Sequence, residues 1–333
     1  MRFRRIQSVH FVLPFLLVAM LHSQGKIDSS RHTVQMVPVE KGVSLEVLDW
    51  GGTGRPLVLL TGLGDTAHIF DEFSPKLTPS YHVYGITRRG RGASSAPEPN
   101  ATNYTADRLG EDVLAVIDAL HLNKPVIAGH SISGEELSYI GSHHPEKVAG
   151  LIYMEAGYSY ALYDQANGQL ELDSIELRNQ LRQFIEGYSM EPVKDYDSLI
   201  ANLQLVEREV KEQQQDAGNL PPTPVSLRMT PDLFAIMEGR ERFTTIHAPA
   251  LVIFADGGNL GPVSGDDPQS RALTLRQALM KRNKEAQIAA FERQVPSAHV
   301  VRIPRATHYV FRSNEADVLR EVSTFIATLP PPN

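Results

Sequence analysis

Short apolar runs rich in β-branched residues alternate along most of the chain with longer segments of helical periodicity. This alternation is typical of a parallel sheet covered by helices. From the third run onward the apolar residues are nearly continuous, as in strands buried on both faces. The first two runs alternate more strictly and predict an antiparallel hairpin at the sheet edge. The predicted strands are Val34–Val39, Ser44–Asp49, Pro56–Thr61, His82–Thr87, Val126–Gly129, Leu151–Glu155, Leu251–Ala255 and His299–Ile303.

Helical patterns fill the intervals between several of these strands. Thr105 can cap a helix that runs to about Leu120 with its apolar residues on one face. A second helix is expected immediately after Ser131, ending near His143, and a third over Glu315–Ile326. The predicted fold is therefore α/β, with a mostly parallel eight-stranded sheet and helices on both faces.

The alternation stops over residues 157–243. Because this insertion follows a strand whose end should border the site, we expect it to form a helical cap that acts as a lid. An accessory lobe without a chemical role is the alternative. The α/β core would comprise residues 26–156 and 244–333. The predicted cap elements are two amphipathic helices, Ile175–Tyr188 and Ser198–Gln214, the turn-rich Pro221–Pro224, and a short helix from Pro231.

The first 25 residues have a different character. Three arginines among the first five residues precede an apolar run, Val9–Leu21, and Ser23-Gln24-Gly25 offers a small-x-small cleavage site. This layout predicts a signal peptide over residues 1–25, and hence an exported protein. An uncleaved anchor is the alternative, but the run is shorter than the roughly 20 residues of a spanning helix.

Charge and composition exclude several classes of function. The 333 residues carry a formal net charge of −7, which argues against binding nucleic acid or anionic lipid through a general basic field. The absence of cysteine excludes disulfides, thiolate catalysis and thiolate metal sites. No histidine pair has the H-x-x-x-H spacing of a zinc site.

Ser131 is the candidate nucleophile. The apolar strand ending at Gly129 leads directly into His130-Ser131, and a helix is expected from Ile132. A serine on such a strand-to-helix turn is exposed for attack, provided that the neighbouring residues are small. The usual pattern is G-x-S-x-G; here Ser133 fills the fifth position and glycine follows one place later. A helix-capping serine is the alternative.

The base and the oxyanion donors have candidates on other loops. His308 lies between the last strand and the last helix, as expected from the chain order serine, acid, histidine. His130 is expected to pack at the turn rather than to act as the base. The glycines of Thr61–Gly64 allow backbone N–H groups to face a substrate oxygen. We expect the N–H groups of Leu63 and Ile132 to be the donors.

With these features the chain resembles the α/β-hydrolase superfamily over nearly all of its predicted mature length. The matching segments are the Thr61–Gly64 loop, the Arg89–Ser94 segment, the Ser131 turn and the region of His308. The family usually has Asp before the second of these, where this chain has Thr87. Members with an Asp nucleophile hydrolyse epoxides or haloalkanes, so a serine there implies acyl chemistry.

The resemblance implies two positions for the acid. In most members the acid follows the seventh strand in a pattern like L-V-I-x-G-x-x-D. Aligning residues 251–258 with that pattern puts a glycine in the acid position and Asp256 two residues early. In a subset, including some haloalkane dehalogenases, the acid ends the sixth strand, where this chain has Glu155. Glu155 is the first candidate and Asp256 the second, with Asp266 and Asp267 also open.

The sequence thus predicts a serine hydrolase that cleaves an ester or related acyl bond of a small molecule and needs no metal or organic cofactor. A proline iminopeptidase-like aminopeptidase and a non-catalytic ligand-binding protein of the same fold are the alternatives. Apolar residues of the short cap helix could line an acyl or alcohol pocket, although packing explains them equally well. They are Leu233, Phe234, Ile236 and Met237.

Overall fold

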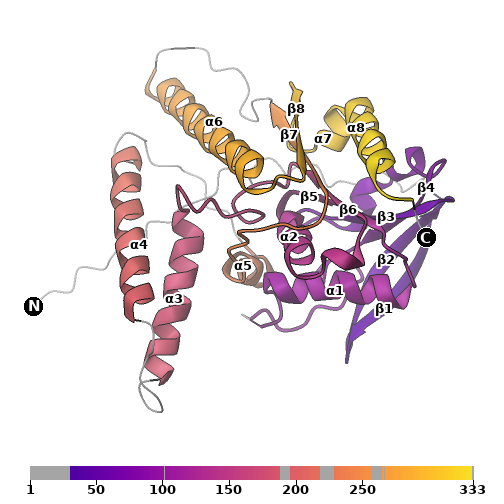
Figure 1. The fold of residues 1–333 in the computed structure, drawn as a ribbon, viewed down its shortest axis with the longest axis horizontal. Coiled ribbons are helices and arrows are strands. Elements are labelled where there is room, and N and C mark those ends of the chain that lie inside the picture. The colour runs from indigo at the N-terminus through magenta and orange to yellow at the C-terminus, as the bar shows by residue number, and fades with distance from the viewer. Residues whose placement is uncertain are drawn as a thin grey trace, which may run out of the picture.

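The structure is a computed structural model that describes residues 31–100, 102–187, 196–217, 229–256, 265 and 267–331. The predicted signal peptide, the Pro221–Pro224 turn and Asp266 lie outside these residues. Figure 1 shows a twisted sheet flanked by helices, with the α3–α4 pair standing to one side. Within the described part of the chain, no helix has both the length and the apolar character needed to cross a bilayer.

One sheet holds all eight predicted strands, in the order β1-β2-β4-β3-β5-β6-β7-β8. β1 pairs with β2 and β2 with β4 in antiparallel fashion, and the remaining neighbours are parallel. The predicted sheet and its edge hairpin are confirmed. The strands are β1 Thr33–Glu40, β2 Val43–Gly51, β3 Arg55–Leu60, β4 Tyr81–Ile86, β5 Val126–His130, β6 Gly150–Met154, β7 Ala250–Asp256 and β8 Ala298–Pro304.

The predicted helices are all present, but others were not predicted. The long helix α6 and the short helix α7 lie where no helix was predicted, and a 3-10 turn, η5, which begins at Ser131, precedes α2. The α-helices are α1 Ala106–Ala119, α2 Gly134–His143, α3 Leu170–Gly187, α4 Tyr196–Ala217, α5 Pro231–Glu238, α6 Pro268–Gln294, α7 Val310–Ser313 and α8 Glu315–Thr328. The 3-10 turns are η3 Ala67–Phe70, η4 Ser74–Lys76, η5 Ser131–Ser133 and η6 Pro145–Lys147.

Thr105 precedes α1 as predicted, but the expected cap is wrong in its chemistry. The Thr105 hydroxyl donates to the side chain of Asp107 instead of accepting a backbone N–H of the helix. The N–H groups that Thr105 would cap donate to carboxylates instead: that of Asp107 to Glu241 at 3.3 Å, and that of Arg108 to Asp107 at 2.7 Å. The start of α1 is held instead by the Ala106 N–H, which donates to the carbonyl of Gly239.

The sheet separates two hydrophobic clusters because successive side chains of a strand point to opposite faces. Val58 and Leu60 of β3 join the cluster beneath α1 and α2, whereas Leu57 and Leu59 join the cluster beneath α8. All four side chains are buried. A strand that is buried on both faces reads as a continuous apolar run, which is why the sequence predicts β3 so clearly.

The helices inserted between β6 and β7 are tied to one another by ion pairs. Arg240, just after α5, binds Glu171 of α3 at 2.9 Å, and Arg242 binds Asp173 of α3 at 2.6 Å. On α5, Leu233 and Ile236 are buried in the first cluster while Phe234 is 54% exposed. Packing therefore accounts for two of the apolar residues that were candidates for a substrate pocket.

A buried ion pair joins α1 to the Arg89–Ser94 segment. The fully buried Arg89 donates to both carboxylate oxygens of Asp112, at 2.6 Å each. Removing one partner of a buried pair leaves its charge poorly compensated, and without Asp112 the buried Arg89 would keep only the partly exposed Glu40, at 2.9 Å, as an anionic partner. We expect Asp112→Ala to lower the free energy of unfolding by about 3–5 kcal/mol in urea denaturation.

The exposed pair Lys147–Asp118, at 3.0 Å, provides the matched control. Lys147→Ala should change the free energy of unfolding by no more than about 1 kcal/mol. Equal effects of Asp112→Ala and Lys147→Ala would contradict this account of the Arg89 pair.

Candidate active site

Ser131 occupies a strained turn between β5 and α2. Its φ is +56°, a left-handed conformation that non-glycine residues rarely adopt. The Ser133 hydroxyl closes the turn by donating to the carbonyl of His130 at 2.8 Å. At Gly134, a Cβ atom would collide with the carbonyl of Ala156. Serine at 133 and glycine at 134 thus both suit this turn, which explains the departure from G-x-S-x-G.

His308 lies beside Ser131 although 177 residues separate them in the sequence. Its Nε2 is 2.9 Å from Ser131 Oγ, and its Nδ1 is 3.3 Å from Glu155 Oε2. A carboxylate can only accept, so the proton sits on Nδ1 and Nε2 accepts the serine hydroxyl. The structure therefore brings together three of the predicted site residues in the order that an acyl-transfer triad requires.

His130 positions the loop that carries His308. The His130 Nε2–H donates to the backbone carbonyl of His308 at 2.9 Å, and its ring packs against Tyr309 and Phe311. Burial, with a smaller contribution from the charge of His308, holds the pKa of His130 well below its ordinary value of 6.5. His130 is thus a neutral packing residue at the turn, as the sequence indicates.

Glu155 follows β6 directly and its side chain is fully buried. Its φ is +50°, so it shares the left-handed conformation of Ser131. Besides the contact with His308, its carboxylate accepts from the Tyr158 hydroxyl at 2.7 Å and from the Ala255 N–H. The Lys284 ammonium lies 3.6 Å from Oε1. Each carboxylate oxygen thus has a donor.

The surroundings of Glu155 keep it ionised. Burial alone would raise its pKa, but the hydrogen bond from His308 and the positive charge of Lys284 outweigh that effect. The Tyr158 hydroxyl adds to them, and the pKa of Glu155 falls below its ordinary value of 4.5. A buried carboxylate is therefore available as an anion at neutral pH beside the Nδ1 of His308.

The other candidate acids lie elsewhere. Asp256 ends β7 with an exposed side chain, and its backbone carbonyl accepts from the Arg305 N–H at 3.3 Å. Asp267 accepts from the N–H and the hydroxyl of Ser270 at the start of α6, at 3.1 and 2.6 Å. That carboxylate caps a helix. The geometry favours Glu155 over both as the partner of His308.

A buried arginine orients the loop that contains Leu63. Arg88 donates to the carbonyls of Thr61 at 3.0 Å and Gly62 at 3.3 Å, and its Nε donates to Glu136 of α2 at 2.7 Å. A trans peptide directs its N–H opposite to its carbonyl, so the Leu63 N–H points away from Arg88. This arrangement suits an oxyanion donor, and the paired register of Leu60 with Gly129 brings β3 beside the Ser131 strand.

Three residues near the site were missed by the sequence analysis. Tyr158 contacts Glu155, and the Tyr160 hydroxyl is within hydrogen-bonding reach of Ser131. Both tyrosines lie close after Glu155 in the sequence, and this proximity could have identified them as residues near the site. Lys284 lies on α6 and donates to the carbonyl of Ala255 at 2.6 Å. Only the helix-forming composition of residues 268–294 could have predicted α6, and nothing in it marks Lys284.

Comparison with known proteins agrees with this geometry. The family model described as "alpha/beta hydrolase fold" matches residues 55–193. The chain has the α/β-hydrolase fold. A solved hydrolase from Pseudomonas aeruginosa has the same fold as this chain, with a TM-score of 0.54 at 20% identity over 89% of this chain and 99% of that one.

Two of the curated relatives that are similar in sequence are an animal lipase and a bacterial lactonase. An sn-1-specific diacylglycerol lipase of Danio rerio is 23% identical over 85% of this chain and 82% of the lipase. A 3-oxoadipate enol-lactonase of Acinetobacter baylyi is 30% identical over 32% of this chain and 39% of the lactonase. The chain spans about two fifths of the length of several other curated relatives that it matches.

The lowered pKa of Glu155 predicts how stability depends on pH. Because the carboxylate is a stronger acid in the folded state, its stabilising contribution is complete above the unfolded value of about 4.5 and is lost as pH falls through the lower folded pKa. We expect Glu155→Gln to be less stable than the wild type by about 1–3 kcal/mol at pH 7. That deficit should shrink below pH 4.5 in urea denaturation.

Asp256→Asn is the control, since that side chain is exposed. The free energy of unfolding of Asp256→Asn should differ little from that of the wild type at every pH. A Glu155→Gln deficit that stays constant from neutral to strongly acidic pH would show that the Glu155 carboxylate is not stabilised as described.

Proposed function

We propose that the protein is a serine hydrolase that cleaves a carboxylic ester or a related acyl bond through an acyl-enzyme intermediate. The observation that carries this proposal is the hydrogen-bonded series from Ser131 through His308 to the buried Glu155, at 2.9 and 3.3 Å. This series combines a nucleophile, a base and an orienting anion in the geometry of acyl transfer.

In the first half of the proposed reaction, His308 takes the proton of Ser131 as Oγ attacks the substrate carbonyl carbon. The ionised Glu155 stabilises the imidazolium that forms. The N–H groups of Leu63 and Ile132 stabilise the tetrahedral oxyanion, Ile132 being at the start of the helical segment after the turn. His308 then donates its proton to the leaving group, and the acyl group stays on Ser131.

In the second half, water replaces the leaving group. His308 removes a proton from that water, whose oxygen attacks the acyl carbon, and returns the proton to Ser131 Oγ as the acid product departs. Tyr160, whose pKa is raised well above its ordinary value by burial, remains protonated and can donate to the serine oxygen. None of these steps requires a metal or organic cofactor.

The relatives support an ester as the substrate. The lipase and the lactonase are named for hydrolysis of carboxylic esters, which is the chemistry of enzyme class EC 3.1.1. A small-molecule ester suits a site in which Tyr158 and Tyr160, at the start of the inserted segment, already border Glu155 and Ser131. We also propose that residues 157–243 act as a lid over the site. Residues 1–25 would act as a signal peptide that directs export.

Labelling by a fluorophosphonate, which phosphonylates an activated serine, tests this function. We expect the wild type to label stoichiometrically and Ser131→Ala to lose labelling by at least about a thousandfold in rate, because the nucleophile is gone. Ser138→Ala is the matched control: its hydroxyl is also buried, but it lies within α2 and contacts the Tyr153 hydroxyl at 3.1 Å. It should label within about tenfold of the wild type.

Equal labelling of Ser131→Ala and the wild type would reject the serine-hydrolase function. Retained binding of esters without labelling would instead favour a ligand-binding protein of the same fold.

A further inference from the structure

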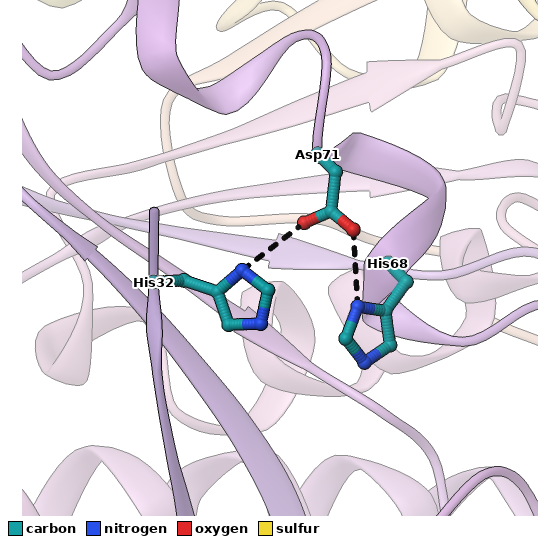
Figure 2. A group of neighbouring side chains, drawn as sticks. All are labelled: His32, His68 and Asp71. Carbon is teal, nitrogen blue, oxygen red and sulfur yellow. Dashed lines mark hydrogen bonds and ion pairs between the residues drawn. The ribbon is translucent and has the colours of Figure 1, made fainter. Parts of the chain in front are cut away.

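A second cluster of chemically competent side chains lies outside the Ser131 site. His32, just before β1, and His68, on η3, both face Asp71, which follows η3 (Figure 2). The Nδ1 atoms of His32 and His68 are 3.5 and 3.0 Å from the two carboxylate oxygens of Asp71. One ligand atom from each residue can be chosen so that all three lie within 4.8 Å of one another.

We propose that His32, His68 and Asp71 bind a divalent transition-metal ion of the zinc class. Two imidazoles and one carboxylate form a ligand set preferred by Zn²⁺ and its first-row neighbours, and not by Mg²⁺ or Ca²⁺. In a tetrahedral zinc site with bonds of about 2.0–2.2 Å, neighbouring ligand atoms are about 3.3 Å apart. The separations of 3.5 Å from His32 to Asp71 Oδ1 and 3.0 Å from His68 to Asp71 Oδ2, one to each carboxylate oxygen, are close to that value.

The groups around the cluster form a second shell of the kind that metal ligands require. Trp50 Nε1–H donates to Asp71 Oδ1 at 3.1 Å and fixes the carboxylate. The Glu46 carboxylate lies 4.0 Å from His68 Nε2, on the side of the ring away from Asp71. Metal-bound histidines commonly direct their second nitrogen toward a carboxylate in this way.

Glu46 places a buried carboxylate beside the cluster, with its Oε1 at 4.0 Å from His68 Nε2. It is only 6% exposed, and its Oε2 has no hydrogen-bond partner among the described residues. A neutral His68 carries a single ring proton, which can serve the carboxylate of Asp71 or that of Glu46 but not both. A metal ion on Nδ1 leaves that proton on Nε2, where it faces Glu46.

The exposure of the cluster allows an ion to enter. The side chains of His32 and Asp71 are 7% and 13% exposed, while that of His68 is 39% exposed. Protein atoms thus surround the ion on one side, and water can complete its coordination on the side of His68. An ion here would join the start of β1 to η3, which follows the Thr61–Gly64 loop. Its role would be to stabilise the fold, separate from the chemistry at Ser131.

Zinc titration of the chelator-treated, purified chain tests this proposal. Isothermal titration calorimetry should give one Zn²⁺ per chain, and Zn²⁺ at about a hundredfold excess over its Kd should raise Tm by about 5 °C. Mg²⁺ at the same concentration should leave Tm unchanged. Co²⁺ should show the visible absorption of a nitrogen- and oxygen-ligated ion.

Two variants locate the binding site. His68→Gln and Asp71→Asn should each lose the Zn²⁺-dependent rise in Tm, measured from the variant's own metal-free value so that altered stability does not matter. Asn at position 71 retains an acceptor for Trp50. His82→Gln is the matched control, because His82 pairs with Asp49 at 2.9 Å. It should keep the full Zn²⁺ response.

The proposal is overturned if the wild type shows neither binding heat nor a rise in Tm. It is also overturned if His68→Gln and Asp71→Asn respond to Zn²⁺ as the wild type does, or if His82→Gln loses the response equally.

Discussion

The buried contact between Glu155 and His308 is the constraint on which the rest of the site depends. A carboxylate without solvent exposure is stable as an anion only if donors and a positive charge replace water. His308, Tyr158 and the Ala255 N–H supply the donors, and Lys284 supplies the charge. These groups come from four separate segments of the chain. Assembly of the anion's environment therefore requires the whole second half of the fold.

The parallel sheet makes that assembly possible. The carboxyl ends of β3, β5, β6 and β7 meet at one edge, and the chain order reverses between β3 and β5, where such folds place their ligands. Two of the residues at this edge, Ser131 and Glu155, have positive φ. Strain of this kind persists only where the surroundings fix it, as Ser133 does for Ser131. Local strain and long-range packing thus serve the same site.

The sequence predicted the sheet well because buried parallel strands are short, continuous and apolar. It also identified Ser131, His308 and Glu155 as candidates, although it left Asp256 open as the acid. Their contact could not be derived, because it depends on distances between strand ends. The long α6 was missed, and with it Lys284, since its apolar residues do not gather on one face and give only a weak helical periodicity. The cluster of His32, His68 and Asp71 was missed because His32 lies far from the other two residues in sequence.

The turnover of a nitrophenyl ester by Glu155→Gln and Asp256→Asn, measured side by side, tests the central claim most directly. If Glu155 orients His308 and stabilises its imidazolium, Glu155→Gln should lower kcat by about three to four powers of ten. Asp256→Asn should change kcat by less than about tenfold, because its side chain faces solvent. A large loss in Asp256→Asn, with Glu155→Gln close to the wild type, would contradict the account.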